Sequence, residues 1–423
     1  MQRPAPAAQL APDQPCIDCL DEPAATRRRP STGLRPNTAP RVAFWLIAVV
    51  LTSIMLGTTL PTPLYVIWQG QWHFSAVLVT VIFAVYAVAV LVALLFAGRS
   101  SDQAGRKPVL AVALGCSAVS TIVFILAPDV GVLFVGRILS GLSAGLTTGT
   151  ATAALTELAP ASAGRRASLV ATAANMGGLG LGPLIAGLFA QFAPDPTVLV
   201  FEIYLAVLAA AGLCLFFVPE TVSPRRRPTL RFAGLGVPRQ GRGGFIAAAA
   251  AGFAAFSLIG LLTALAPTFL GSVLHDRSHA VAGAVVFALL AAGAITQVAV
   301  SRFASRRVML AGLGLFLVGL ALLPAALSQA SMALFLTATT VSGIAVGAVF
   351  LGSLATANRL APPGQRGQVV STYFVACYCG LIVPVVGVGV LAEFVSDFTA
   401  VLALAIVLAV LSVAALAGIR RAL

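Results

Sequence analysis

Groups that perform acid–base or metal chemistry are scarce in this chain of 423 residues. Charged residues make up 9% of it, and only 13 residues are Asp or Glu. The three histidines, His73, His275 and His279, fall between apolar segments, and no D-D-x-x-D run or paired carboxylates occur within such a segment. Enzymes that modify lipids inside a membrane need clusters of these residues. We therefore expect no enzyme, no metal site and no cofactor.

Cysteine is also sparse, and its positions exclude a disulfide framework. Cys116, Cys214, Cys377 and Cys379 lie inside apolar runs, where they are expected to be small core residues. Cys16 and Cys19 form a single C-x-x-C. One such pair cannot complete a four-ligand zinc site.

Apolar residues dominate instead. They make up 59% of the chain, and the mean hydropathy is +1.00, far outside the range of soluble globular proteins. The formal net charge of +13 would suggest nucleic acid as the partner of a soluble protein, but nearly all cations lie in short segments between apolar runs. We predict a multi-pass protein whose partner is the lipid bilayer, with no nucleic acid.

Twelve apolar segments have the length that a helix needs to cross the hydrocarbon layer, about 20 residues. Pro61 and Pro63 interrupt the first segment and predict a bend in it. The predicted segments are 42–68, 76–97, 109–127, 130–157, 167–193, 198–218, 245–270, 280–300, 308–327, 332–357, 369–392 and 398–419.

The connections between these segments alternate in charge. One set, together with the two tails, holds 24 of the 26 Lys and Arg residues, and the other set holds only Arg277. Basic loops stay on the cytoplasmic side of a membrane, so both termini are predicted to be cytoplasmic, in a cell membrane such as the bacterial inner membrane. Residues 1–41 are rich in Pro, Ala and Arg and are predicted to be a disordered cytoplasmic tail.

The two halves of the chain are related. Residues 219–244 form the longest internal polar stretch and separate six segments from six. Gly164, Arg166 and Thr172 recur 200 residues later, while Ser140, Gly141 and Gly145 recur at an offset of 202. This repeat predicts an all-α integral membrane fold of 12 transmembrane helices in two pseudo-symmetric six-helix bundles, 42–218 and 245–423.

A charged hinge between the second and third segments carries a recognisable motif. It reads Gly98-Arg99-Ser100-Ser101-Asp102-Gln103-Ala104-Gly105-Arg106-Lys107-Pro108. Glycines at such a turn allow positive φ, and the carboxylate can serve helix N-termini or nearby cations. The hinge resembles the G-x-x-x-D-x-x-G-R-[KR] loop of the major facilitator superfamily, and the resemblance covers residues 42–419.

The resemblance implies a conformational latch on the cytoplasmic side. Its residues are Gly98, Asp102, Gly105, Arg106 and, at the end of the fourth segment, Glu157. Asp102 is expected to pair with Arg106 and, when the cytoplasmic side is closed, to accept backbone N–H groups near Gly367. A solvated helix end is the alternative interpretation of Glu157.

Arg137 is the one cation inside a membrane segment. It lies about seven residues into the fourth segment, at ~10 Å depth, where a guanidinium costs at least ~2.5–3.5 kcal/mol unless something offsets it. An arginine that reaches back to the headgroups is the alternative. Arg137 and Gly141 match the superfamily's helix-4 R-x-x-x-G pattern, which implies a role in the proton path.

The fifth segment contains a run of small residues around Pro183. Gly182 and Pro183 predict a bent helix, and Gly178 and Gly182 supply a face for close packing, which ordinary helix packing could also use. The run through Gly187 resembles G-x-x-x-G-P-x-x-G-G, a motif associated with drug:proton antiporters, with Ala186 in place of one Gly. The resemblance implies an antiporter.

Polar residues that could line a central cavity are few. They are Asn175, Gln297, Tyr373 and Tyr378. No acid lies near the middle of a segment, which favours neutral or weakly anionic amphiphiles over cations as substrates. We predict a monomeric secondary transporter that exports small amphiphilic compounds, such as antibiotics, in exchange for protons. The alternatives are a dedicated exporter of one metabolite, such as a sugar or amino-acid derivative, an uptake carrier, or a channel.

Overall fold

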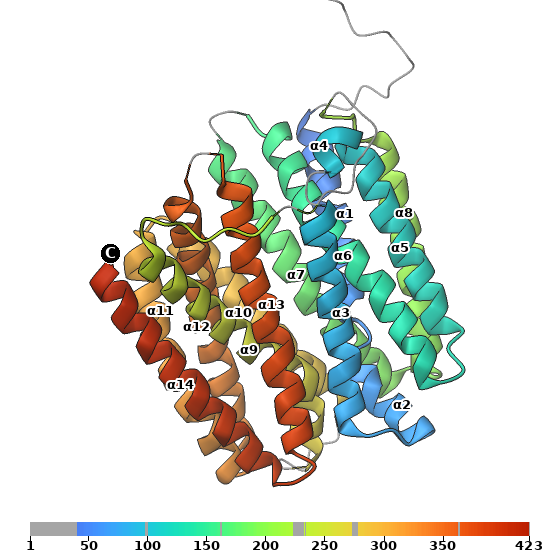
Figure 1. Cartoon of the computed structure of the whole chain (residues 1–423). Coiled ribbons are helices and arrows are strands. Elements are labelled where there is room, and N and C mark those ends of the chain that lie inside the picture. The colour runs from blue at the N-terminus through green and yellow to red at the C-terminus, as the bar shows by residue number, and fades with distance from the viewer. Residues whose placement is uncertain are drawn as a thin grey trace, which may run out of the picture. The chain divides into compact units, whose positions relative to one another are not determined.

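A computed structural model describes residues 40–97, 100–160, 163–222, 232, 234–272, 278–362 and 364–422. The predicted tail therefore lies almost wholly outside the described residues, as do Cys16 and Cys19. The described residues form helices joined by short connections, without strands (Figure 1). The elements are α1 (Pro40–Thr59), η1 (Thr62–Leu64), α2 (Tyr65–Trp72), α3 (Ala76–Ala97), α4 (Ser100–Ala104), α5 (Arg106–Ile125), α6 (Val130–Leu158), α7 (Gly164–Phe192), α8 (Pro196–Phe217), α9 (Arg242–Ser272), α10 (His279–Val300), α11 (Ser305–Ser328), α12 (Met332–Leu360), α13 (Arg366–Leu391) and α14 (Asp397–Ala422).

Twelve helical spans in the described part of the chain are long and apolar enough to cross a membrane. Each predicted segment coincides with one of them, and helix ends differ from the predicted ends by at most about four residues. The first span is broken as predicted. Helix α1 ends at Thr59. Pro61 precedes the short 3-10 helix η1, Pro63 lies inside it, and α2 follows.

The two halves use the same set of helix pairs, as pseudo-symmetry requires. In the first half α5 packs on α6 and α8, and in the second half α11 packs on α12 and α14. Helix α1 packs on α6, α7 and α8, and α9 packs on α12, α13 and α14 in the same way. The fold is therefore an all-α arrangement of two related six-helix bundles. The exact bounds of the predicted domains stay a prediction.

The halves meet through two further helix pairs, which are themselves related by the repeat. Helix α7 of the first half packs on α10 of the second, and α3 packs on α13. Figure 1 shows α3 and α13 side by side between the two groups of helices. One end of the bundle, called the arginine-rich end, holds α4, the starts of α1, α5, α7, α9, α11 and α13, and the ends of α3, α6, α8, α10, α12 and α14. The opposite end holds the other ends of the membrane spans.

Candidate functional site

The hinge at the arginine-rich end is a short helix followed by a turn at a glycine. Residues Ser100–Ala104 form α4, where the sequence predicted only a tight turn. Gly105 follows with φ of +101°, so its predicted positive φ is confirmed. Gly98 lies outside the described residues. The turn lets α5 begin directly beside α4, with Arg106 as its first residue.

Arg106 joins three elements through one guanidinium group. Its Nη1 lies 2.6 Å from Oδ1 of Asp102, and its Nη2 lies 2.8 Å from Oε1 of Glu157. Nε of Arg106 also donates to Oε2 of Glu157 at 3.3 Å, so the arginine binds that carboxylate with both arms of its fork. The guanidinium is about 10% exposed, whereas Asp102 is 59% exposed. The structure thus brings together Asp102, Arg106 and Glu157, and their role as a latch stays a prediction.

A carboxylate that the sequence analysis did not single out completes this network. Glu220, three residues after the end of α8, accepts the backbone N–H groups of Arg106 at 2.8 Å and Lys107 at 3.0 Å. It therefore caps the N-terminus of α5, whereas the sequence analysis expected Asp102 to serve a different helix start, near Gly367. Lys107 in turn donates to the carbonyl oxygens of Phe216 and Val218 at the end of α8.

Arg137 is completely buried, so it does not reach back to the headgroups. Its Nη1 donates to the backbone carbonyl of Thr58 at 2.6 Å. Its guanidinium carbon lies 4.6 Å from the centre of the Tyr86 ring and 5.8 Å from the rings of Tyr65 and Phe83. We call these three rings the aromatic cage. Ring faces stabilise a cation without a counter-charge.

The guanidinium of Arg137 keeps unused hydrogen-bonding capacity. Its Nε and Nη2 have no partner among the described residues, nor does the buried hydroxyl of Tyr65. In the described part of the chain no carboxylate lies within ion-pair distance of Arg137. A buried charge with unpaired N–H groups is strongly stabilised by any hydrogen-bond acceptor that reaches it. The cage itself was not predicted from the sequence.

Helix α7 packs closely on α1 along the predicted small-residue face. A Cβ added to Gly178 would lie 2.6 Å from the Thr52 carbonyl oxygen, and one added to Gly182 would overlap the Leu56 carbonyl. Pro183 lacks an N–H, so the carbonyl of Leu179 one turn earlier loses its helical donor. The hydroxyl of Thr59 on α1 donates to that carbonyl at 2.8 Å and replaces the lost bond.

The other side of α7 contacts the second half of the chain. A Cβ on Gly187 would lie 2.5 Å from the carbonyl oxygen of His279, and Gly283 of α10 sits against the Pro183 carbonyl. The backbone N–H of His279 donates to Oε1 of Gln191 on α7 at 3.0 Å. The glycines around Pro183 thus bring α1 and α10 against opposite sides of one helix. Their link to antiport stays a prediction.

The four residues predicted to line a cavity lie in different surroundings. Gln297 on α10 donates from Nε2 to Sδ of Met176 on α7 at 3.1 Å, one residue from the half-buried Asn175. Tyr373 is fully buried, with its hydroxyl 2.7 Å from that of Ser353. Tyr378 meets Phe256 edge to face. The structure places Gln297 against Met176, the neighbour of Asn175 in α7, at the boundary of the halves, and Tyr373 inside the second half.

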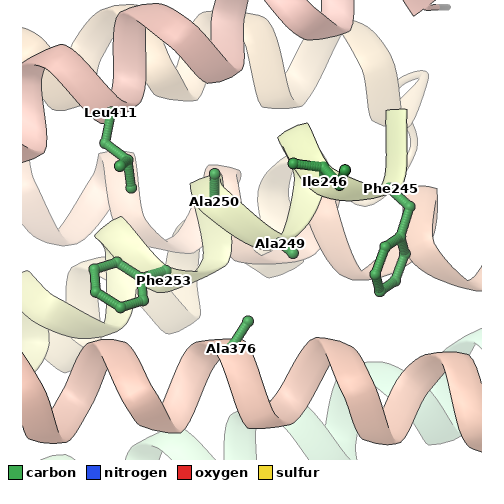
Figure 2. Close-up of a pocket in the computed structure, with 7 residues that line it drawn as sticks. All are labelled: Phe245, Ile246, Ala249, Ala250, Phe253, Ala376 and Leu411. Carbon is green, nitrogen blue, oxygen red and sulfur yellow. The ribbon is translucent and has the colours of Figure 1, made fainter. Parts of the chain in front are cut away.

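A groove of about 320 Å³ lies elsewhere, between α9, α13 and α14 (Figure 2). Its lining includes Phe245, Ala249 and Phe253 of α9, Ala376 of α13 and Leu411 of α14. The described residues that line it are all apolar, and none of them belongs to the predicted cavity. It is an apolar surface groove and is distinct from the surroundings of Arg137.

Two family models match the chain. The model of the Major Facilitator Superfamily matches residues 45–307, and the model described as Sugar (and other) transporter matches residues 243–420. Together they extend over both halves of the fold.

Several curated proteins of Bacillus subtilis (strain 168) are similar to part of the chain. The uncharacterized MFS-type transporter YceJ is 29% identical over 185 residues, 44% of this chain and 46% of its own length. Multidrug resistance protein 1 is 28% identical over 34% of this chain and 38% of its own length, and Multidrug resistance protein 2 is 27% identical over 44% and 46%. The chain thus matches less than half of the length of each of these relatives.

Solved structures share the fold over almost the whole chain. A bacterial homolog of the human lysosomal transporter Spinster, in an inward-facing and unoccupied conformation, superposes with a TM-score of 0.69 at 15% identity. It covers 91% of this chain and 98% of its own. The human organic anion transporter MFSD10 superposes with a TM-score of 0.63 at 18% identity and covers 91% of this chain and 100% of its own.

Proposed function

The chain belongs to the major facilitator superfamily, and from this premise we propose that it exports small amphiphilic compounds across a cell membrane in exchange for protons. It is a multi-pass membrane transporter rather than an enzyme. In the proposed arrangement both termini and the arginine-rich end face the cytoplasm, as the distribution of basic residues favours. One chain acts as a monomer, and its two halves rock around the substrate.

The observation that carries the proposal is the buried Arg137. Its two free N–H groups and the free hydroxyl of Tyr65 are donors, and the cage around them is aromatic. Such a site suits a compound with an apolar ring system and a neutral or weakly anionic acceptor group. A cationic drug would meet an uncompensated positive charge there. The names of the two multidrug resistance proteins support export of amphiphiles, at low identity.

Arg137 also suits a role in proton coupling. The positive charge of Arg137 stabilises an anionic acceptor group that binds its free N–H groups, whether the group belongs to the substrate or to another partner. Protonation of that acceptor group weakens the interaction. Loading and unloading of a proton then changes how tightly the site holds its substrate. The helix pairs α3–α13 and α7–α10, where the halves meet, are the elements that a change of access must rearrange.

Transport by purified protein in proteoliposomes tests the proposal. An imposed pH gradient should drive accumulation of a fluorescent neutral or weakly anionic amphiphile against its concentration, and an ionophore that removes the gradient should stop it. If the amphiphile moved only down its own concentration gradient, the protein would act as a channel. Substrate-driven movement of protons in the same direction as the substrate would contradict antiport.

A susceptibility panel on cells that overproduce the protein distinguishes the alternatives for the substrate. Resistance to several unrelated amphiphilic antibiotics is the expected result. A single narrow phenotype would instead favour a dedicated exporter of one metabolite. The match of the second half to the Sugar (and other) transporter model makes sugar derivatives the first compounds to test in that case.

A further inference from the structure

The two halves differ in their acidic residues at the arginine-rich end. In the first half Asp102, Glu157 and Glu220 surround the start of α5 and accept from Arg106 or its backbone. In the second half the sequence has no acid at this end. Asp276, between the α9 and α10 segments of the sequence, is the only acid between residues 221 and 392, and none follows Asp397.

Arginines stand in the second half at positions that correspond to these carboxylates. When Arg106-Lys107 is aligned with Arg306-Arg307, an offset of 200, Arg302 stands at the position of Asp102. With the offset of 202, Arg359 stands where Glu157 stands. Where Glu220 follows the end of α8, the last turn of α14 carries Arg420 and Arg421. We call Arg302, Arg306, Arg359 and Arg420 the arginine cluster.

Helix packing brings the elements of the arginine cluster to one place. Helix α11 packs on α12 and α14, as α5 packs on α6 and α8. A Cβ added to Gly352 of α12 would lie 2.8 Å from the carbonyl oxygen of Ser305 at the start of α11. Arg359 lies two turns beyond Gly352, towards the arginine-rich end. The start of α11 and the ends of α12 and α14 therefore converge, as in the first half.

Nothing in the described part of the chain neutralises this cluster. The side chains of its four arginines form no hydrogen bond or ion pair with a described residue, and Nε of Arg306 is buried without a partner. Helix α11 begins after Ala304 without a side-chain cap, whereas Glu220 caps α5. Four cations at the ends of packed helices repel each other unless an anion joins them.

We propose that the arginine cluster binds a phosphate group, which takes the place that carboxylates hold in the first half. Arginine forks match phosphate oxygens in geometry and charge, and the uncapped N–H groups of α11 add donors. The cluster lies at the end of membrane-spanning helices, which is the depth of lipid headgroups. The phosphate comes either from an anionic phospholipid or from free phosphate in solution, and the two sources are separable by experiment.

Thermal unfolding of the purified full-length protein provides the test. Phosphatidylglycerol, phosphatidylcholine of the same acyl chains, and inorganic phosphate are each added to the protein in detergent. A rise in Tm with phosphatidylglycerol but not with the other two assigns the site to lipid. A rise with inorganic phosphate alone assigns it to free phosphate. No rise with either anion overturns the proposal.

Two variants of one residue make the result specific. Arg359→Gln should weaken binding of the effective phosphate compound about fivefold, the effect of one basic residue near an anionic surface. Arg359→Glu restores the carboxylate that Glu157 supplies in the first half, so the protein without added phosphate should gain stability and no longer respond to it. Arg41→Gln, an exposed cation at the start of α1 in the first half, is the matched control and should respond like the unchanged protein.

The Glu variant also covers the case in which Arg359→Gln does not fold. Bound lipid that co-purifies with the protein can then be compared by mass spectrometry between Arg359→Glu and Arg41→Gln. Loss of phosphatidylglycerol only from Arg359→Glu supports a lipid site. Equal retention in the two variants, with equal response of Tm, would show that phosphate does not bind through this cluster. Failure of the proposed export would leave these measurements unaffected.

Discussion

At the residue scale, Arg137 has the most unusual environment in the described structure. It is a fully buried cation that a single carbonyl and three aromatic rings hold in place. This arrangement fixes the side chain but leaves two N–H groups without acceptors. The unsatisfied groups lower the stability of the fold, but they remain available to bind a substrate. Its second-half counterpart is Thr339, so the shared fold does not require the charge.

We predict that Arg137→Ala abolishes coupled transport and leaves a folded, inserted protein. The substitution removes a buried charge that nothing described compensates, so Tm should change little or rise. Proton movement driven by substrate in proteoliposomes measures the coupling. Tyr86→Phe keeps the ring beneath the guanidinium and is the matched control, with transport near that of the unchanged protein. Coupled transport by Arg137→Ala would contradict the role of Arg137.

A second residue-scale prediction concerns the cap of α5. Glu220→Gln weakens two hydrogen bonds to the backbone of Arg106 and Lys107. Loss of a helix cap costs ~1 kcal/mol, so we expect a lower Tm. Glu202, which is exposed on α8, provides the control Glu202→Gln with unchanged Tm. Equal Tm values for the two variants would show that the cap contributes nothing.

Asp102→Asn separates a latch from a structural ion pair. The carboxylate of Asp102 is 59% exposed, and Arg106 still forms its ion pair with Glu157 in the variant. The free energy of unfolding should therefore fall by less than ~1 kcal/mol. We nevertheless predict slower transport with little change in substrate affinity, because the contact predicted near Gly367 is lost from the state with a closed arginine-rich end. Turnover and binding are measured in proteoliposomes. A wild-type rate, or lost binding with normal turnover, would exclude the latch.

The sequence identified notable single residues correctly where they belong to a motif or lie deep inside a membrane segment. Asp102, Arg106 and Glu157 do meet, and Arg137 is buried. It did not predict their partners from other segments. Glu220 follows α8, and Tyr65 and Tyr86 come from α2 and α3, so only the packing of helices shows which side chains they contact.

At the scale of elements, helix α7 shows how one proline organises its neighbours. The carbonyl of Leu179, freed by Pro183, binds Thr59 of α1, and the carbonyl of Pro183 itself lies against Gly283 of α10. The sequence predicted the small-residue face of α7, while the predicted bend at Pro183 stays a prediction. It did not predict that both sides of the helix are used, because the register between α7 and α10 is a property of the tertiary fold.

We predict that Gly283→Ala disturbs the α7–α10 contact. The added methyl group would overlap the Pro183 carbonyl, and overpacking of this kind costs roughly 1–3 kcal/mol. Tm should fall, and so should transport, because this pair joins the two halves. Gly177→Ala on α7 is the control, since a Cβ there meets no atom within 4 Å. A Tm for Gly283→Ala as high as that of Gly177→Ala would show that the helices can separate at no cost.

At the scale of the whole molecule, the sequence predicted the helix count and the repeat with most success. Apolar length determines where a chain can cross a membrane, and two related halves must use related helix pairs, so both follow from the pattern of residues. The contacts between the halves could not be predicted in this way. Thr80 of α3 and Gly389 of α13 meet near the opposite end, although neither belongs to a motif.

The last prediction uses that contact to test whether the halves move. A Cβ added to Gly389 would lie 3.3 Å from Cβ of Thr80, close to the ~3.8 Å of a disulfide. In a variant whose six native cysteines are replaced, Thr80→Cys with Gly389→Cys should form a disulfide on oxidation. The lock holds the opposite end closed, so transport should stop and return on reduction. Thr80→Cys alone should transport under both conditions. Full transport by the oxidised double variant would show that α3 and α13 need not separate there, which rules out rocking of the two halves about this contact.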